Sequence, residues 1–569
     1  MPKYTVKGVG PIDLTQKDFI ADGGEGDVFG KGSMAYKIYK DANKMLPVAK
    51  IQELSVLTHP NIIKPQQILL NKGNKPIGYS MKLVNGSALC QLFNKAFRQR
   101  NNIDNDQILK LVKYFHSMIE SIHQKGILVV DLNEMNFLVN STFDELYAID
   151  VNSYQTPSFP ATVIMDSVRD RHCNSRFSKE TDWFSWGILT FQMLIGIHPY
   201  KGGHPSTQGI PRDEWLNHRM LKNISAFNKD TSLPKVCCPF DVIPPALRQW
   251  YKAVFEDGKR VDPPVDFQNI AQIIATIKQV AGSNLFDMML VEKFESDILG
   301  FYAYEGDRLV LTDKEVHVNG RSYPVPSNNC RFTFTPKLMR PIAVYLEGQS
   351  VRVFDIFNQK QLPFNCNAGA ITQCDNRIYI QNGMSILELE FMESNNVIQC
   401  FTDLVTDVLD MPNATKVLDG VILQNIMGRF YVSIFPTVGR CRQMAFPCLD
   451  NYKIIDAKFE KNVLVIVAAR RTGEYDRFVF RYAADHQTHD MRKVENIVYS
   501  GINFTVNDAG VCTLLNEEEK LEAFSNKKDA GTVKILDDPA IESDMQLHHE
   551  GTKILFIRGK NLHSISMRK

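Results

Sequence analysis

The chain has 569 residues, of which 44% are hydrophobic and 23% are charged. This length exceeds what a single hydrophobic core normally supports, so two or more domains are expected. The 65 basic and 64 acidic residues leave a formal net charge of +1, which argues against a general binder of nucleic acid or of anionic membranes. Eleven cysteines without a C-x-x-C pair disfavour both a disulfide framework and a zinc ribbon.

The sequence contains no apolar signal core and no apolar run long enough to span a bilayer. Together with the cysteine pattern, this predicts a soluble, intracellular protein located in the cytoplasm. Neither a nucleic acid nor a membrane is expected as a partner.

A glycine-rich turn is the first predicted feature, at ADGGEGDVF (21–29), and an alternating strand follows at MAYKIYK (34–40). Glycines let a backbone bend closely over phosphate groups, whose charge the exposed N–H groups can hold. Lys37 on the strand is therefore a candidate to pair with phosphates. Glu53 lies in a short helical stretch before LTHPNIIKP and is a candidate partner for the Lys37 ammonium.

Three helices are predicted in the rest of the first half. The segment 104–126 has apolar residues at three- and four-residue spacing and ends at a glycine. The segment 181–200 begins with a Thr-Asp cap signal and is apolar until it stops before Pro199. A third amphipathic pattern covers 269–283 and ends at Gly282.

Polar residues that suit a hard cation lie between short strands. In ILVVDLNEMNFLV (127–139), Asp131 is followed five positions later by Asn136, and Asp150 ends the next short strand in YAIDVNSY. The D-x-x-x-x-N pattern alone is weak, because Asp and Asn are ordinary turn residues. Two carboxylates and an amide at the ends of neighbouring strands can nevertheless hold Mg²⁺, with substrate phosphates completing its shell.

Taken together, these segments resemble the protein kinase fold over roughly residues 15–285. The resemblance implies an α+β, two-lobed domain, with an N-lobe at about 1–84 and a C-lobe at about 85–285. It implies that ATP and Mg²⁺ are bound, with Asp131 as the catalytic base, Lys37 as the phosphate-pairing lysine, and Asn136 and Asp150 as metal ligands. Asp182 in TDWFSWG would brace the backbone of the catalytic loop.

The resemblance also implies a set of nucleotide-binding positions in the N-lobe and at the hinge GYSMKLVNG. Gly23 and Gly26 would be the later two glycines of the flap, with Ala21 in place of the first. A valine would pack on adenine, Met81 would be the gatekeeper, and two hinge residues would offer backbone bonds to adenine. The implied set is Gly23, Gly24, Gly26, Val28, Lys37, Glu53, Met81, Leu83 and Val84.

Several positions depart from the kinase pattern. Val129 and Val130 replace the His-Arg pair before the catalytic aspartate, and Asn133 replaces the lysine that meets the γ-phosphate. Asn152 stands at the third D-F-G position, and no A-P-E is visible. Arg169 or Arg171 would either bind a substrate phosphate or pair with Asp170. The variant loop is similar to those of atypical bacterial and phage-encoded kinases, including kinases of tellurite-resistance-linked phosphorylation systems.

The second half has a different rhythm. A linker is predicted at 286–298, followed by an all-β domain over 299–569. Short β-like runs recur there with turns near 306, 347, 375, 419, 460, 508 and 550. All but one of the intervals are roughly 40–48 residues, a period typical of four-stranded propeller blades. We expect a six- or seven-bladed β-propeller, and a pair of β-sandwiches is the alternative.

The sequence predicts an ATP- and Mg²⁺-dependent phosphotransferase, a Ser/Thr protein kinase whose propeller recruits a protein substrate or partner. One alternative is a nucleotide-binding pseudokinase that serves as a scaffold. A virion- or assembly-associated interaction protein is another, and virion association would accompany a phage origin. Phosphorylation of a small molecule is also compatible with the loop.

Overall fold

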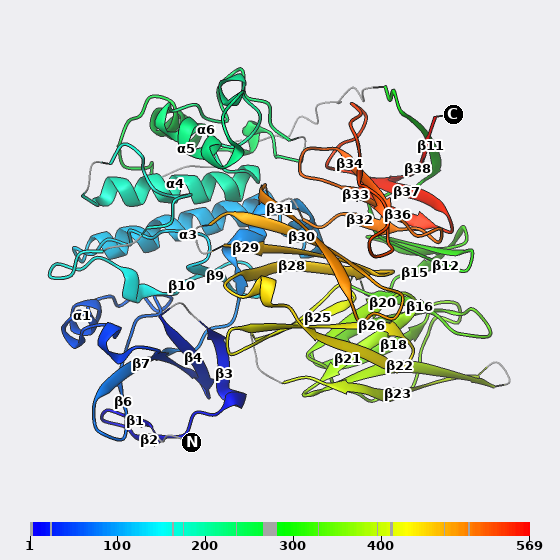
Figure 1. Ribbon diagram of the computed structural model, residues 1–569, viewed down its shortest axis with the longest axis horizontal. Helices are drawn as coiled ribbons and strands as arrows, with labels where there is room; N and C mark the ends of the chain where they lie inside the picture. The colour runs from blue at the N-terminus through cyan, green and yellow to red at the C-terminus, as the bar shows by residue number, and fades with distance from the viewer. Residues whose placement is uncertain are drawn as a thin grey trace.

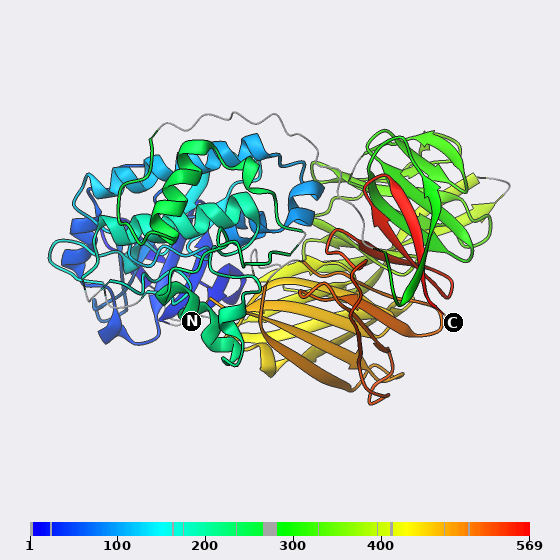
Figure 2. The ribbon, with the colours of Figure 1, turned by 90° about the horizontal axis from the view of Figure 1, so that it is seen from above.

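The structure is a computed structural model, in which the first half of the chain forms two lobes and the second half is built from strands (Figure 1). Seen from above, the two halves lie side by side (Figure 2). The described residues are 4–22, 25–161, 164–173, 176–234, 236–265, 282–327, 329–394, 397–409, 414–470, 473–498 and 501–568. Within these ranges, no helix is both long and apolar enough to cross a membrane.

The N-lobe is a seven-stranded sheet with the order β2-β1-β6-β7-β5-β4-β3. The central strands contain runs of three or four consecutive buried residues, so both of their faces are largely covered there. One short helix, α1 (Val48–Leu54), connects β5 to β6. The strands are β1 (Tyr4–Val6), β2 (Gly10–Ile12), β3 (Phe19–Asp22), β4 (Gly26–Lys31), β5 (Met34–Tyr39), β6 (Ile68–Leu70) and β7 (Pro76–Lys82).

The C-lobe is mostly helical, and two of its helices were predicted. Helix α3 (Asn105–His123) begins at a capping box on Asp104, and α4 (Lys179–Ile195) ends at Gly196, whose φ of 92° closes the helix. The α4 N-cap is Ser178, three residues before the predicted Thr-Asp signal. The other helices are α2 (Lys95–Arg100), α5 (Trp215–Leu221) and α6 (Pro245–Phe255). The predicted helix 269–283 lies almost wholly outside the described residues.

Eight short 3-10 helices complete the helical part of the described chain. They are η1 (Gln16–Asp18), η2 (Ala42–Lys44), η3 (Leu89–Phe93), η4 (Val151–Ser153), η5 (Pro205–Thr207), η6 (Arg212–Glu214), η7 (Phe240–Val242) and η8 (Pro447–Leu449).

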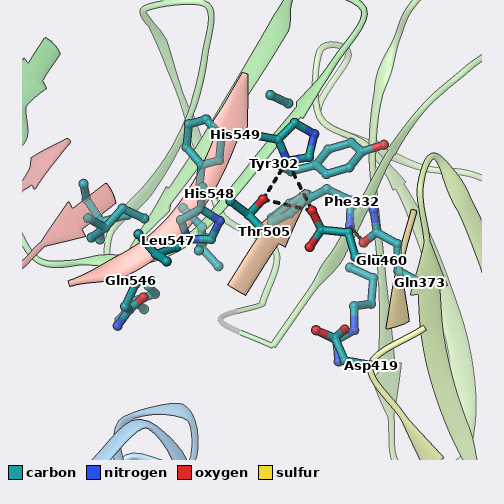
Figure 3. Close-up of a pocket in the computed structure, with 18 of the residues that line it drawn as sticks. Tyr302, Phe332, Gln373, Asp419, Glu460, Thr505, Gln546, Leu547, His548 and His549 are labelled. Atoms are coloured by element: carbon teal, nitrogen blue, oxygen red, sulfur yellow. Dashed lines mark hydrogen bonds and ion pairs between the residues drawn. The ribbon is translucent and has the colours of Figure 1, made fainter. Parts of the chain in front are cut away.

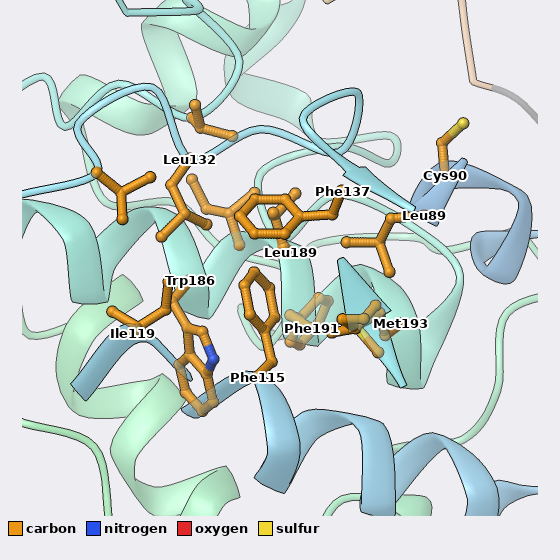
Figure 4. Packing of buried hydrophobic residues seen from close by; sticks show 14 of the residues in the cluster. Leu89, Cys90, Phe115, Ile119, Leu132, Phe137, Trp186, Leu189, Phe191 and Met193 are labelled. Carbon is orange, nitrogen blue, oxygen red and sulfur yellow. The ribbon is translucent and has the colours of Figure 1, made fainter. Parts of the chain in front are cut away.

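Aromatic and aliphatic side chains of α3 and α4 interlock in the core of the C-lobe (Figure 4). Trp186, Leu189 and Phe191 of α4 are fully buried and meet Phe115 of α3 and Phe137 of the small sheet described below. Helix α4 is buried on nearly all sides, which explains its almost continuous apolar sequence. This core is the rigid support of the loops that follow.

A three-stranded sheet on the C-lobe carries the two predicted metal ligands. Its order is β10-β9-β8, with β8 (Ser87–Ala88), β9 (Phe137–Val139) and β10 (Leu146–Ala148). Asn136 immediately precedes β9, and Asp150 follows β10 by two residues. Because β9 and β10 are antiparallel and Phe137 pairs with Ala148, the start of one strand meets the end of the other.

From residue 286 onward the described chain forms seven antiparallel four-stranded sheets. Six of them are consecutive meanders, each made of four strands in chain order. They are β12 (Ile298–Tyr304), β13 (Asp307–Thr312), β14 (Glu315–Val318), β15 (Arg321–Pro324); β16 (Arg331–Phe334), β17 (Pro341–Glu347), β18 (Ser350–Asp355), β19 (Lys360–Gln361); β20 (Ala370–Cys374), β21 (Arg377–Asn382), β22 (Ser385–Ser394), β23 (Val397–Asp407); β24 (Thr415–Leu418), β25 (Val421–Ile426), β26 (Arg429–Thr437), β27 (Arg440–Ala445); β28 (Lys453–Glu460), β29 (Val463–Ala469), β30 (Tyr475–Tyr482), β31 (His489–Ile497); and β32 (Phe504–Val506), β33 (Val511–Leu515), β34 (Leu521–Ser525), β35 (Lys534–Leu536).

The seventh sheet joins the two ends of this region and corrects the predicted linker. It has the order β11-β38-β37-β36, with β11 (Phe286–Lys293), β36 (Gln546–Glu550), β37 (Lys553–Arg558) and β38 (Asn561–Met567). Residues 286–293 of the linker predicted at 286–298 are therefore a strand. Its partner is almost at the other end of the chain, with Phe286 opposite Met567, so no local sequence pattern announces the pairing.

The one irregular interval in the predicted turn spacing has a structural cause. The turn near 347 joins β17 to β18, the second and third strands of its sheet. Five of the other predicted turns join the first and second strands, as in the β12–β13 and β24–β25 hairpins, and the turn near 550 joins β36 to β37 in the seventh sheet, described above. Counting the turn between β16 and β17 instead would have made the spacing more even.

Candidate functional site

Lys37 lies on β5 beneath the glycine-rich turn, and its ammonium contacts two acidic side chains. Its Nζ is 3.3 Å from Glu25 Oε2 and 3.4 Å from Asp150 Oδ1. Burial alone lowers the pKa of Lys37, but nearby acidic groups, Asp150 foremost, outweigh burial, so the net pKa is raised. The lysine therefore stays protonated between the two lobes.

Asn152 connects Lys37 to Asp150. With its amide oxygen 3.3 Å from Lys37 Nζ, its nitrogen donates to Asp150 Oδ1 at 2.8 Å and faces the Tyr79 hydroxyl at 2.8 Å. Its backbone carbonyl accepts from Lys50 Nζ at 2.8 Å. Asn152 thus connects the two lobes. The sequence showed only that this residue differs from the glycine of the D-F-G pattern and did not predict that role.

Glu53 does not contact Lys37, which corrects the predicted pairing. It lies on the exposed side of α1, and its Oε2 accepts the Ser158 N–H at 3.2 Å. Hydrogen bonds from Ser158 and Thr156 lower the pKa of its carboxyl. Lys50, three residues earlier on α1, is the residue that faces the site. The prediction was wrong by about one helical turn because α1 offers only two buried apolar positions to set its register.

Asp131 and Asn136 face each other across the loop 131–136, the predicted catalytic loop. The Asn136 amide donates to the Asp131 backbone carbonyl at 2.9 Å and to its Oδ2 at 3.3 Å. The Asn136 carbonyl accepts the Ile149 N–H at 2.9 Å, which holds the loop against the segment that ends in Asp150. The structure thus brings Lys37, Asp150, Asn136 and Asp131 together, although 113 residues separate Lys37 from Asp150.

The second Asp131 oxygen is also held. Its Oδ1 accepts the Met165 N–H at 2.8 Å. Burial raises the pKa of the Asp131 carboxyl, and hydrogen bonds from Met165, Asn133 and Asn136 only partly offset that effect. A carboxylate has about four acceptor positions, so room remains for one more donor such as a substrate hydroxyl.

Asp182 braces the catalytic loop as predicted. The side chain is fully buried in α4, and its two oxygens accept the N–H groups of Val129 and Val130, each at 2.8 Å. His123 Nε2 lies 2.9 Å from Asp182 Oδ2. Val130 has a φ of 63°, which is strained for a β-branched residue, and the Asp182 bond stabilises that conformation.

Asn133, which replaces a kinase lysine, has a structural role. It is buried, its Oδ1 accepts the Met135 N–H at 2.9 Å, and its Nδ2 reaches the Asp131 carbonyl at 3.3 Å. The side chain shapes the loop and contributes no positive charge.

The predicted nucleotide-binding positions are distributed around this cleft. Val28 of β4 pairs with Lys37 of β5, and Met81 of β7 pairs with Ala35. Leu83 donates its N–H to the Ser33 carbonyl at 2.9 Å, so that hinge N–H already has a partner, and Val84 follows it. Gly26 lies in β4, where a Cβ would collide with the Ile38 carbonyl, so a glycine is required for close strand pairing. Gly23 and Gly24 lie outside the described residues.

Asp170 pairs with neither Arg169 nor Arg171. Its carboxylate binds Arg260, beyond α6, through two bonds of 2.6 and 2.7 Å. Arg171 instead contacts Asp166 at 3.6 Å and Asn217 at 2.9 Å. The Asp170–Arg260 pair anchors the segment after Asp150 to the chain just beyond α6.

A large cavity lies elsewhere, mainly among the seven sheets, with part of the segment 94–104 also on its wall. It has a volume of about 2120 Å³ and is lined by residues of several sheets, among them Tyr302, Gln373, Asp419 and Glu460 (Figure 3). Glu460 accepts from Lys458, Thr505 and the Val506 N–H at 2.7–2.9 Å, so much of the charge on the wall is internally paired. No group of three or more His, Cys, Asp or Glu in the described ranges is arranged to hold a metal.

No protein-family profile matches the chain. Part of it is similar to Ser/Thr kinases. Serine/threonine-protein kinase KIN4 of Saccharomyces cerevisiae is 25% identical over 186 residues, 30% of this chain and 22% of the relative. Probable serine/threonine-protein kinase PknB of Lactococcus lactis is 25% identical over 193 residues, 32% of this chain and 30% of the relative. Smooth muscle myosin light chain kinase of Gallus gallus is 22% identical over 181 residues, 29% of this chain and 9% of the relative.

The matches thus cover under a third of the chain and no more than 30% of these three relatives. They support a kinase-like region in the N-terminal part of the chain. The all-β half lies outside the part of the chain that these matches support.

Proposed function

We propose that the chain is an ATP- and Mg²⁺-dependent phosphotransferase that phosphorylates Ser or Thr in a protein. The observation that carries the proposal is the contact between Lys37 and Asp150 at 3.4 Å, beside a loop in which Asn136 and Asp131 face each other. The similarity of part of the chain to Ser/Thr kinases supports the same conclusion.

The donor atoms suit Mg²⁺ and a triphosphate. Asp150 and Asn136 supply the hard oxygen donors that Mg²⁺ prefers, and the Asp150 side chain is 43% exposed, so a ligand can reach it. Lys37 supplies a fixed positive charge for phosphate oxygens. When bound, Mg²⁺ neutralises the negative charge of the phosphates during transfer.

In this proposal the residues of the chain do three things. Lys37 binds and orients the phosphates, and Asn152 keeps the ammonium directed into the cleft. Asp131, whose raised pKa makes it a better proton acceptor than an exposed aspartate, receives the proton of the acceptor hydroxyl. Asp182 and Asn136 hold the loop so that Asp131 does not have to reorganise, and such positioning supplies much of the rate enhancement in phosphoryl transfer.

A pseudokinase scaffold is the second candidate, and one observation favours it. Both Asp131 oxygens already accept hydrogen bonds, and Glu25 occupies a position on Lys37 where a phosphate would bind. Under this alternative, nucleotide would raise the melting temperature without any transfer of phosphate.

We further infer that the seven sheets are the blades of a β-propeller that recruits a protein partner. Regular four-stranded meanders, and a last sheet that joins the first strand to the final three, support this architecture. The cavity among the sheets is one surface that a partner could use. A cytoplasmic location agrees with the proposed use of ATP.

The test is transfer of labelled γ-phosphate from ATP to a host lysate by purified protein. We expect Asp131→Asn and Asp150→Ala to abolish labelling. The control is Asp241→Asn, which changes an aspartate whose side chain is 88% exposed. This variant should label the lysate as strongly as the wild type does. Equal labelling by Asp150→Ala and wild type would reject the proposed function.

A further inference from the structure

One sheet of the C-terminal half packs directly against the catalytic loop. Strands β28 and β29 lie beside β9 (Figure 1). Buried side chains from both halves belong to one hydrophobic cluster. The members from this sheet are Ile455, Val467, Ala469, Tyr475 and Ile497. They join the cluster that contains Leu89, Cys90 and Leu132 of the kinase-like half.

The first polar contact within this interface reaches the catalytic loop itself. Tyr475, the first residue of β30, donates its hydroxyl to Glu134 Oε1 at 2.9 Å. Glu134 lies between Asp131 and Asn136 in the sequence and is 2% exposed. Its second oxygen is buried and makes no hydrogen bond among the described residues. On the same loop, Lys453 of β28 lies 3.5 Å from the Met135 carbonyl.

A second contact touches the other side of Asp131. Gly473 lies in the turn between β29 and β30 with a φ of 94°, and a Cβ there would be 2.5 Å from Met165 Sδ and 2.7 Å from Ser167 Oγ. The turn therefore approaches the backbone segment whose Met165 N–H holds Asp131 Oδ1. One hairpin thus contacts both segments that fix the carboxylate.

The hairpin is itself firmly held. Asp476, next to Tyr475, is fully buried and binds Arg470 at 2.8 Å, Tyr452 at 2.7 Å and Lys493 at 3.1 Å. These bonds fix the strand ends on either side of the turn, so Tyr475 has little freedom to follow a moving loop.

We propose that the β29–β30 hairpin is a built-in part of the phosphotransfer site and that Tyr475 is a positioning residue, which acts on Asp131 through Glu134. The inference rests on the proposed function and adds to it that the all-β half takes part in the chemistry. A kinase-like half without this sheet would keep the Asp182 bonds to the loop but would leave Glu134 without the Tyr475 hydroxyl.

The physical reason is the cost of burying Glu134. The residue is 2% exposed, its Oε1 accepts the Tyr475 hydroxyl at 2.9 Å, and its Oε2 makes no hydrogen bond in the described structure. Without the Tyr475 hydroxyl, the buried Glu134 carboxylate loses that hydrogen-bond donor, and moving toward water then lowers its free energy. Such a movement would carry Asp131 and Asn136 with it, because all three belong to one six-residue loop.

The experiment compares Tyr475→Phe with Tyr482→Phe in the full chain. Both residues lie on β30 and are buried, but the Tyr482 hydroxyl has no hydrogen-bond partner in the described structure. We expect Tyr475→Phe to lower kcat about tenfold, as loss of a hydrogen bond to a charged group does, with KM for ATP nearly unchanged. Tyr482→Phe should leave both constants as they are.

A second readout does not depend on activity. Amide hydrogen exchange at residues 131–136 should become about tenfold faster in Tyr475→Phe, while exchange in α4 stays unchanged. Adding Glu134→Gln to Tyr475→Phe should slow the exchange again, because a neutral amide tolerates the lost partner better than a carboxylate does.

Unchanged exchange at 131–136 in Tyr475→Phe would overturn the inference, whatever the activity. If the wild type transfers no phosphate, the proposed function fails, and the exchange measurement still decides whether Tyr475 positions the loop. Equal loss of kcat in Tyr482→Phe would also overturn it, since the effect would then reflect the core rather than the hydrogen bond.

Discussion

Asp131 is half-buried, and it is ionised only at a cost, because this burial raises the pKa of its carboxyl. A folded-state pKa above the unfolded value means that ionisation destabilises the native state at neutral pH. The environment of Asp131 therefore favours proton uptake by its carboxylate at the expense of the stability of the fold, a trade-off that is common at functional sites.

We predict that Asp131→Asn raises the free energy of unfolding at pH 7 while it abolishes phosphate transfer. This gain in the free energy of unfolding should be fully present at a pH above the pKa of Asp131 in the folded protein. It should disappear as the pH falls below the ordinary pKa of an aspartate, because the Asp131 carboxyl of the wild type is then as neutral as the amide of the variant. Urea denaturation of both proteins at pH 7 and pH 4 measures the difference, with Asp241→Asn as the exposed control. A stability loss at pH 7 would contradict the prediction.

Asp182 represents the opposite case, a buried carboxylate with all its partners. Asp182→Ala leaves two buried N–H groups, those of Val129 and Val130, without an acceptor. We expect a loss of about 3–5 kcal/mol in the free energy of unfolding, the range for breaking a buried charged network. Chemical denaturation measures it. A loss below about 1 kcal/mol, typical of exposed pairs, would show that the network contributes little.

The sequence predicted the places of those site residues that lie close together in the chain or on one hairpin. Asp131 and Asn136 share one loop, and Lys37 lies on a strand whose neighbours are set by a tight hairpin, so their relative places follow from local pattern. The partner of Lys37 did not follow, because it depends on how α1 packs.

At the scale of elements, α1 illustrates that limit. Its seven residues put Lys50 toward the site and Glu53 toward Ser158, whereas Glu25 of the glycine-rich turn reaches Lys37. A short helix takes its rotation from tertiary packing, which a single sequence does not encode locally. The strand β11 is similar, since it is defined by a partner about 280 residues away.

One prediction distinguishes Glu25 from Glu53 as the acidic partner of Lys37. Glu25→Gln should tighten binding of Mg-ATP up to about fivefold, because it removes an exposed anion that competes with phosphate for Lys37. Glu53→Gln should leave the affinity unchanged. Isothermal titration calorimetry of the two variants checks both, and weaker binding by Glu53→Gln alone would restore the sequence-based pairing.

At the scale of the whole molecule, the turn spacing predicted repeated four-stranded units but not their contact with the catalytic loop. That contact depends on which end of one sheet face meets the C-lobe. Val463 and Val465 of β29 pack toward the next sheet, whereas Val467 of the same strand joins the C-lobe core. All three are buried valines, so composition does not distinguish them.

A shared core should make the two halves unfold together, although chains of this size commonly unfold in parts. All four tryptophans lie in the kinase-like half, at positions 183, 186, 215 and 250, so their fluorescence reports on that half alone. We expect one calorimetric transition that coincides with the fluorescence transition. Val465→Ala, a change confined to the all-β half, should shift both to lower temperature through a loss of roughly 1–3 kcal/mol. A calorimetric shift without a fluorescence shift would mean that the interface does not couple the halves.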